Sequence, residues 1–142
     1  MQILIIRGRL GLAGALRRTF AGMGYLVAEC SGISAAKPWL VTGSIGLVVV
    51  EAELYHGTWR EVLQIAFRSA ERLPVVVAGR PHSMKEYQEA MAEGIRDFLA
   101  PPFSDLEAAR ILTAAGVPPP IPPRIPALPS TAAVPQGGPD AS

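Results

Sequence analysis

Five short, mostly apolar runs recur along the chain, and the segments between them have the spacing of helices. The runs are Gln2–Ile6, Tyr25–Cys30, Ile45–Val50, residues 75–79 and residues 97–100. The third and fourth runs are rich in valine and apolar on both faces of an extended chain. That composition is typical of central parallel strands that are covered on both sides. The pattern therefore predicts five strands.

Each run is followed by a segment with the features of a helix. After the first run, apolar residues recur at helical spacing, at Leu12, Leu16, Phe20 and Met23. Pro38 limits any helix after the second run to a turn or two. Three later segments begin with the capping-box pattern of Ser or Thr followed three residues later by Glu. These pairs are Thr58 with Glu61, Ser83 with Glu86, and Ser104 with Glu107.

Strict alternation of strands and helices predicts an α/β fold in which a parallel sheet has helices on both faces. Nine of the fourteen prolines follow Gly116, and residues 117–142 have no periodic apolar face. We therefore expect one domain at residues 1–116 and a disordered Pro-rich tail or linker at 117–142. Such a tail should contribute little to the stability of the domain.

Charge and cysteine content exclude several classes of protein. The formal net charge is +1 and the charges are scattered, so we expect no nucleic-acid partner. The single cysteine, Cys30, ends an apolar run and is interpreted as a small buried thiol, and the lack of any disulfide within the chain favours a reducing compartment. No apolar stretch reaches transmembrane length, and the start of the sequence does not resemble a signal peptide. These features predict a cytoplasmic protein without a membrane partner.

Two segments resemble the receiver domain of bacterial response regulators. GIRDFLAPPF, at Gly94–Phe103, is similar to that family's ending of a glycine, an aromatic residue and Lys-Pro-Phe, and LPVVVAG, at Leu73–Gly79, is similar to its entry into the fourth strand. The resemblance extends from about Gln2 to Leu112. It implies a CheY-like, flavodoxin-like fold with five parallel strands in the order 2-1-3-4-5. It also implies a bacterial protein of two-component signal transduction.

The family's catalytic positions carry other residues in this chain. Receiver domains have an acidic pair after strand 1, a phosphoacceptor Asp after strand 3, a Thr or Ser after strand 4, and a Lys before a proline after strand 5. The matching residues are Arg7 and Gly8, then Glu51, then Gly79 (or Ala78 after a shift of one), and finally Pro101. The resemblance thus implies a degenerate pseudo-receiver that is not an enzyme and holds no metal or other cofactor. The family's cis proline implies a cis bond between Pro101 and Pro102.

Glu51 has two possible roles at the end of its strand. It is either a surface acid or the partner of Arg7 in an ion pair, because the first and third strands are neighbours in the implied sheet. Arg7 would repel Mg²⁺, which phosphoryl transfer requires. Changing Glu51 to Asp alone should therefore not restore phosphorylation. We expect that Arg7→Asp and Gly8→Asp would also be needed.

A non-catalytic receiver-like domain would act by binding another protein. The resemblance implies a surface made by the fourth helix, fifth strand and fifth helix, at about Met84–Ala115, and the partner could be a second copy of the chain. The residues expected there are Tyr87, Arg96, Phe98 and Arg110.

The alternative is a small Rossmann-like nucleotide-binding protein. Gly8, Gly11 and Gly14 form a G-x-x-G-x-x-G series between a strand and a helix, where glycines allow a pyrophosphate to approach a helix N-terminus. No acidic residue closes the second strand in the usual way, and no Tyr-x-x-x-Lys pair occurs.

Overall fold

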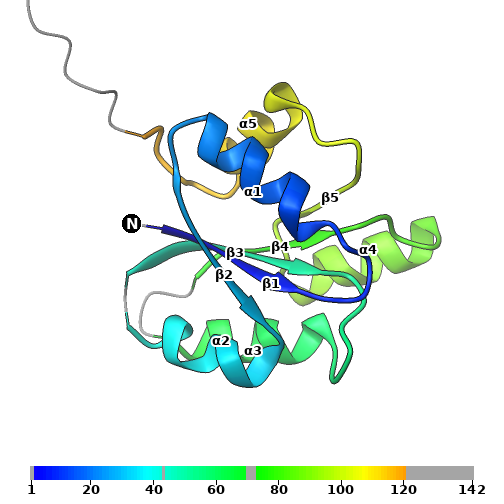
Figure 1. The fold of residues 1–142 in the computed structure, drawn as a ribbon. Coiled ribbons are helices and arrows are strands. Elements are labelled where there is room, and N and C mark those ends of the chain that lie inside the picture. Colours follow the sequence, from blue (N-terminus) through cyan, green and yellow to red (C-terminus); the bar gives the residue numbers. More distant parts are fainter. Residues whose placement is uncertain (1, 43, 70–72, 121–142) are drawn as a thin grey trace, which may run out of the picture.

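A computed structural model describes residues 2–42, 44–69 and 73–120. In this part of the chain, five strands alternate with five helices (Figure 1). The strands are β1 (Gln2–Arg7), β2 (Leu26–Ser31), β3 (Ile45–Glu51), β4 (Val75–Ala78) and β5 (Asp97–Leu99). The helices are α1 (Ala13–Gly22), α2 (Ile33–Leu40), α3 (Trp59–Arg68), α4 (Met84–Glu93) and α5 (Asp105–Ala114). The strands pair in parallel in the order β2-β1-β3-β4-β5, which confirms the predicted fold class and strand order.

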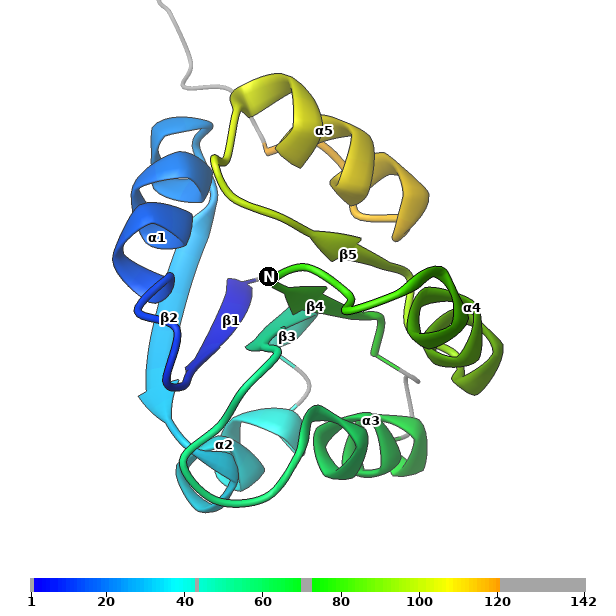
Figure 2. The same cartoon turned by 90° about the vertical axis from the view of Figure 1, so that its right-hand side faces the viewer.

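The central strands are apolar on both faces because the sheet separates two cores. On β1, Leu4 and Ile6 face the core beneath α2, α3 and α4. Ile3 and Ile5, which alternate with them, face the core beneath α1 and α5. Figure 2 looks along the strands and shows the two groups of helices on opposite sides of the sheet. Burial on both faces explains why the strands read as continuous apolar runs rather than as alternating patterns.

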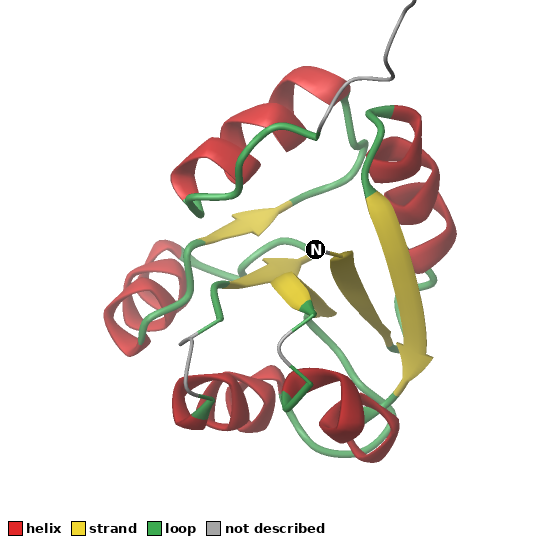
Figure 3. Ribbon diagram, turned by 90° about the vertical axis from the view of Figure 1, so that its left-hand side faces the viewer, coloured by secondary structure: helices red, strands yellow, loops and turns green. Residues whose placement is uncertain are grey.

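Strand β2 lies at an open edge of the sheet, between α1 and α2 (Figure 3). It begins and ends one residue later than predicted, at Leu26 and Ser31. Pro38 lies inside the eight-residue α2, which is about two turns long, as the proline led us to expect.

The capping boxes are only partly formed. The hydroxyls of Ser83 and Ser104 accept hydrogen bonds from the backbone N–H groups of Glu86 (3.0 Å) and Glu107 (3.1 Å). Thr58 is the N-cap residue of α3, but its side chain makes no capping bond, so that part of the prediction is wrong. The carboxylates do not complete the boxes either, because Glu86 accepts from His82 N–H and Glu107 binds Arg110.

The packed chain continues past the predicted domain boundary at Gly116. Val117 is 8% exposed, belongs to the core beneath α1 and α5, and donates its N–H to the carbonyl of Leu112 at 2.9 Å. Pro118 accepts a hydrogen bond of 3.2 Å from the hydroxyl of Tyr25. The remainder of the predicted tail, from residue 121 to residue 142, lies outside the described residues.

Cys30 is buried on β2, as predicted. Burial raises the pKa of its thiol to about 11, although the nearby Arg7 acts in the opposite direction. The thiol is therefore protonated at neutral pH and is a poor nucleophile. None of the helices in the described part of the chain combines the length and apolar character needed to cross a bilayer.

Two truncations test where the folded domain ends. We expect a chain that ends at Pro120 to have the urea midpoint of the full chain, because it keeps Val117 and Pro118. A chain that ends at Gly116 should have a free energy of unfolding about 1–2 kcal/mol lower, since the buried side chain of Val117 is removed. Equal midpoints for the two truncated chains would show that residues 117–120 do not stabilise the domain.

Candidate functional site

The carboxyl ends of the strands bring the predicted pocket positions to one edge of the sheet (Figure 2). Arg7 and Glu51 are the last residues of β1 and β3, and Gly79 and Pro101 follow β4 and β5. The backbone links these ends, since Ala52 N–H donates to Ala78 O (2.8 Å) and Gly79 N–H donates to Leu99 O (2.9 Å). The structure thus places these positions at the same edge of the sheet, where Arg7, Gly8 and Glu51 line one cavity.

Glu51 is buried and binds backbone groups. Its side chain is 1% exposed, so the interpretation as a surface acid is wrong. Oε1 accepts the N–H of Leu10 at 2.8 Å, and Oε2 accepts the N–H of Leu12 at 3.3 Å. Both donors belong to the segment between β1 and α1. Glu51 therefore links the end of the central strand to the start of the first helix.

The first helix needs such a group because it has no cap of its own. Leu12 is the N-cap residue of α1 and cannot accept a hydrogen bond through its side chain, and the first turn contains no acidic residue. A carboxylate close to a helix N-terminus interacts favourably with the helix dipole. The missing cap is visible in the sequence, but the sequence does not show which distant acid replaces it.

Arg7 does not pair with Glu51 in the described part of the chain, so the predicted ion pair is wrong. The Arg7 side chain is 52% exposed, and its Nε lies 4.0 Å from Oε1 of Glu29. Glu29 also accepts a hydrogen bond of 2.8 Å from Arg17 Nε. Exposed pairs of this kind contribute little to stability. Glu29 lies on β2, which is the neighbour of β1 on the side opposite β3.

The positions at Gly8 and Gly79 have little or no room for side chains. A Cβ atom at Gly8 would lie 2.1 Å from the carbonyl oxygen of Glu53, which accepts the N–H of Arg9 at 2.8 Å. Gly79 has a φ of +138°, and a Cβ there would lie 3.0 Å from Ala52 Cβ. The acidic and hydroxyl side chains of receiver domains therefore have no place at these positions unless the backbone moves.

The bond between Pro101 and Pro102 is cis, which confirms the prediction. The carbonyl oxygen of Pro101 accepts a hydrogen bond from Arg80 Nη2. Arg80 comes from the loop after β4, so this bond joins the loops that follow β4 and β5. Pro101, which the resemblance matches to the lysine of receiver domains, therefore contributes its backbone carbonyl to a bond with Arg80.

These residues do not fit a divalent cation. Such an ion needs several oxygen ligands, usually from more than one carboxylate. The cavity at this edge is lined by one carboxylate residue, Glu51, whose two oxygens already accept N–H groups, and by Arg7, which is a cation. Within the described residues, no three His, Cys, Asp or Glu side chains gather as they would around a metal ion.

The glycine series does not form a free phosphate cradle. Gly8, Gly11 and Gly14 line a cavity of about 410 Å³, and Gly11 has a φ of +69°. However, the N–H groups of Leu10 and Leu12, which lie between these glycines, are bound by Glu51. Two of the donors that a pyrophosphate would need are therefore already bonded to a carboxylate of the chain.

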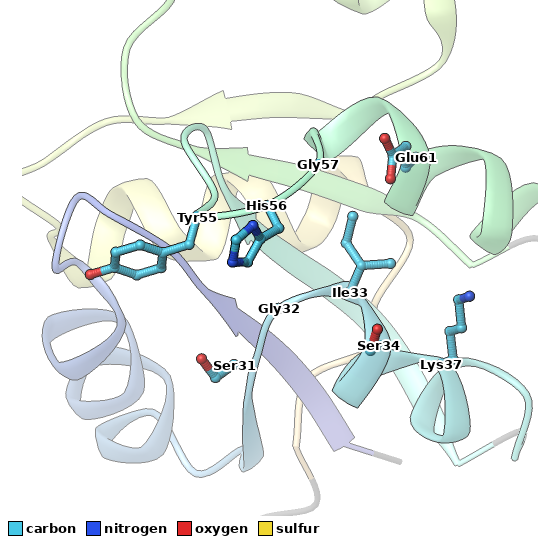
Figure 4. Close-up of a pocket in the computed structure, with 9 residues that line it drawn as sticks. All are labelled: Ser31, Gly32, Ile33, Ser34, Lys37, Tyr55, His56, Gly57 and Glu61. Atoms are coloured by element: carbon cyan, nitrogen blue, oxygen red, sulfur yellow. The ribbon is translucent and has the colours of Figure 1, made fainter.

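A second cavity of about 350 Å³ lies beside the first, between the loops that follow β2 and β3. Ser31 and Tyr55 line both cavities. Figure 4 shows the side chain of His56 pointing from the loop after β3 toward the backbone at Gly32, while Tyr55 extends to the side. Tyr55 is exposed, and the guanidinium carbon of Arg9 lies 5.7 Å from its ring centroid.

The four residues expected on the partner-binding face differ in exposure. Arg96 is exposed and Tyr87 is half-buried. Phe98 is 8% exposed, so it lies beneath the face rather than on it, with its ring centroid 5.9 Å from that of Tyr87. Phe98 is therefore placed to position Tyr87 instead of touching a partner itself.

Arg110 on α5 is exposed but bound to its neighbours. It forms ion pairs with Asp97 (3.3 Å) and Glu107 (2.5 Å). The hydrogen bond with Glu107 raises the pKa of Arg110 and lowers that of Glu107. A partner that recognised the Arg110 guanidinium would have to share it with these carboxylates.

No family model matches the chain, and no curated protein matches it either. Solved structures of receiver domains do resemble it. The chemotaxis response regulator CheY4 of Vibrio cholerae has a TM-score of 0.67 at 15% identity, over 80% of this chain and 97% of that one. The beryllofluoride-activated NtrC4 receiver domain dimer has a TM-score of 0.69 at 16% identity, over 81% of this chain and 96% of that one. The receiver domain of the sensor histidine kinase PA1611 from Pseudomonas aeruginosa PAO1, with magnesium in its active-site cleft, has a TM-score of 0.67 at 16% identity, over 81% and 97%. The chain therefore has the receiver fold.

Removing the Glu51 side chain tests its structural role. We expect Glu51→Ala to lower the free energy of unfolding by about 1–3 kcal/mol, because the N–H groups of Leu10 and Leu12 lose their acceptors. Glu53→Ala is the matched control, since its side chain is exposed and its bonded carbonyl is retained, and it should change stability by less than about 0.5 kcal/mol. Urea denaturation measures both, and equal values for the two variants would contradict this role.

Proposed function

We propose that this domain is a receiver-like signalling module that works without phosphorylation and acts by binding a protein partner. The observation that carries the proposal is the position of Glu51. In receiver domains the residue at this point is the phosphoacceptor, and it lies beside a metal site. Here both carboxylate oxygens of Glu51 are bonded to the backbone, and the residues around it do not fit a metal ion.

The receiver fold supports a signalling role and argues against an enzyme. It covers about four fifths of the chain and nearly the whole of the receiver domains compared with it. Phosphoryl transfer depends almost entirely on positioning and on charge stabilisation by a metal ion and cations. A pocket without the acidic pair, the hydroxyl and the lysine at the matching positions lacks the metal ligands and the ammonium group that receiver domains use. The nucleotide-binding alternative is weaker, because Glu51 occupies donors of the glycine-rich loop.

We propose the face of α4, β5 and α5 as the surface that the partner binds. Helix α4 supports this choice because Ala90 is its single buried residue, so most of the helix is available for contact. Tyr87 and Arg96 provide a half-buried ring and an exposed guanidinium on this face, residue types that are enriched at protein interfaces. One of the similar structures is a receiver domain dimer, and a second copy of this chain is one candidate partner. We place the protein in the bacterial cytoplasm, with residues beyond the folded domain acting as a linker.

Acetyl phosphate tests the loss of phosphorylation. We expect neither the natural chain nor Glu51→Asp to gain a phosphoryl group with acetyl phosphate and Mg²⁺, as measured by intact mass. The aspartate would restore the family's nucleophile, but the metal ligands would still be missing. Adding Gly8→Asp should lower stability rather than restore labelling, because the new Cβ would meet the carbonyl of Glu53. A Mg²⁺-dependent phosphoryl adduct on Glu51→Asp would refute this account.

Site-specific crosslinking tests the proposed face. A photo-crosslinking residue at Gln88, which is exposed on α4, should give a discrete adduct in cells of the native organism. The same residue at Arg18, which is exposed on α1, is the matched control and should give none. Arg96→Glu should reduce the Gln88 adduct, and an adduct of twice the chain mass would identify a homodimer. Equal adducts at Gln88 and Arg18 would contradict the choice of face.

A further inference from the structure

The segment between β1 and α1 holds a carboxylate in the manner of an anion-binding site. The N–H groups of Leu10 and Leu12 both point at Glu51, at 2.8 and 3.3 Å from its two oxygens. They lie at the start of α1, where the helix dipole places partial positive charge. The carboxylate they bind is buried, with 1% exposure, and it comes from a different strand. The bound group is thus equivalent to a carboxylate ligand tethered to the chain.

The donors are held in place by contacts that do not involve the Glu51 side chain. Arg9 N–H donates to the carbonyl of Glu53 at 2.8 Å, and this bond anchors the segment to the loop after β3. Leu12 O accepts the N–H of Leu16 at 3.0 Å, which fixes the other end of the segment to α1. Because these contacts are between backbone groups, a change of the side chain at residue 51 leaves them intact.

The surroundings also suit an anion and give it a way in. Glu51 lines the 410 Å³ cavity together with the guanidinium-bearing Arg7 and with Ser31 and Tyr55. A shorter side chain at residue 51 would open this cavity toward the N–H groups of Leu10 and Leu12. The first turn of α1 contains no acidic side chain that could take the place of Glu51.

We infer that residues 9–12 form a carboxylate-binding site, which Glu51 fills from within the chain and which accepts a free small carboxylate when that side chain is shortened. Such a site binds anions rather than cations, because backbone N–H groups and the helix N-terminus attract negative charge. The inference does not depend on a protein partner, so its failure would leave the proposed signalling role in place.

Acetate is the matched probe, because Glu51→Ala removes the atoms of one acetate ion. We expect the thermal midpoint of Glu51→Ala to rise with acetate and to saturate. The rise should be about 5–10 °C at about ten times the dissociation constant, since the ligand binds the folded state. Acetamide, which has the same shape without the charge, and sodium chloride at equal ionic strength should give no saturable rise. The thermal midpoints of the natural chain and of Glu53→Ala should change with acetate no more than they change with sodium chloride.

Backbone amide spectra locate the binding. Acetate should shift the amide proton signals of Leu10 and Leu12 in Glu51→Ala, while the signals of α4 remain unchanged. If Glu51→Ala is unfolded without ligand, acetate should restore its folded spectrum whereas acetamide should not. An equal response to acetate and acetamide would show that the space is filled without recognition of charge, and would overturn the inference. No response to acetate, in either the folded or the unfolded variant, would also overturn it.

Discussion

A carboxylate that is buried in a protein must be matched by hydrogen-bond donors, and this requirement governs the edge of the sheet where receiver domains carry their chemistry. Glu51 ends the central strand β3 at 1% exposure. Its charge is met by backbone N–H groups at the start of α1 rather than by a cation. An unmatched group in that position would cost several kcal/mol. Glu51 therefore links the loop after β1 to the end of β3, in addition to the backbone contacts that hold this loop.

Contacts between the loops at this edge also leave little room for side chains at the surrounding positions. Once the loop after β1 is held against the loop after β3, the carbonyl of Glu53 occupies the space that a side chain at Gly8 would need. Ala52 and Leu10 crowd Gly79 in a similar way, and the bond from Arg80 to Pro101 joins the remaining two loops. A metal site requires open space and several oxygen ligands at this point. At this edge the chain instead has backbone contacts between the loops and a cavity in which Glu51 is the one carboxylate among the described residues.

The changes at this edge leave the rest of the receiver fold intact. The two cores lie on either side of the sheet, and α4 remains largely exposed, with its Tyr87 packed against Phe98 of β5. In the proposed function, the partner face lies on α4, β5 and α5, apart from the pocket edge at Glu51. The proposed function depends on this separation: the stability of the pocket edge comes from Glu51, and the partner face depends on α4, β5 and α5.

The order of strands and helices could be predicted from the sequence because it depends on local patterns. Valine-rich runs such as Ile45–Val50 must be buried on both faces, and strict alternation with helices leaves a parallel sheet as the arrangement that covers them. Family resemblance in the segment around Pro101 added the strand order and the cis bond. The starts of three helices were predicted as well, since Thr58, Ser83 and Ser104 are N-cap residues, but the side chain of Thr58 does not make the expected capping bond. The sequence shows which residue can cap a helix, but it does not show whether that residue adopts the rotamer that makes the capping bond.

The role of Glu51 could be decided only by the tertiary structure. From the sequence, a surface acid and a partner for Arg7 were both open interpretations, because an acid at the end of a strand can face either solvent or a neighbouring loop. The outcome depends on how the loop after β1 folds over β3. This fold brings to Glu51 two N–H groups that are some forty residues away from it in sequence. Arg7 pairs with Glu29 because β1 has two neighbouring strands, and its guanidinium extends toward β2 rather than β3. Local patterns determine the elements, whereas the pairing of side chains between elements depends on distances that only the folded chain defines.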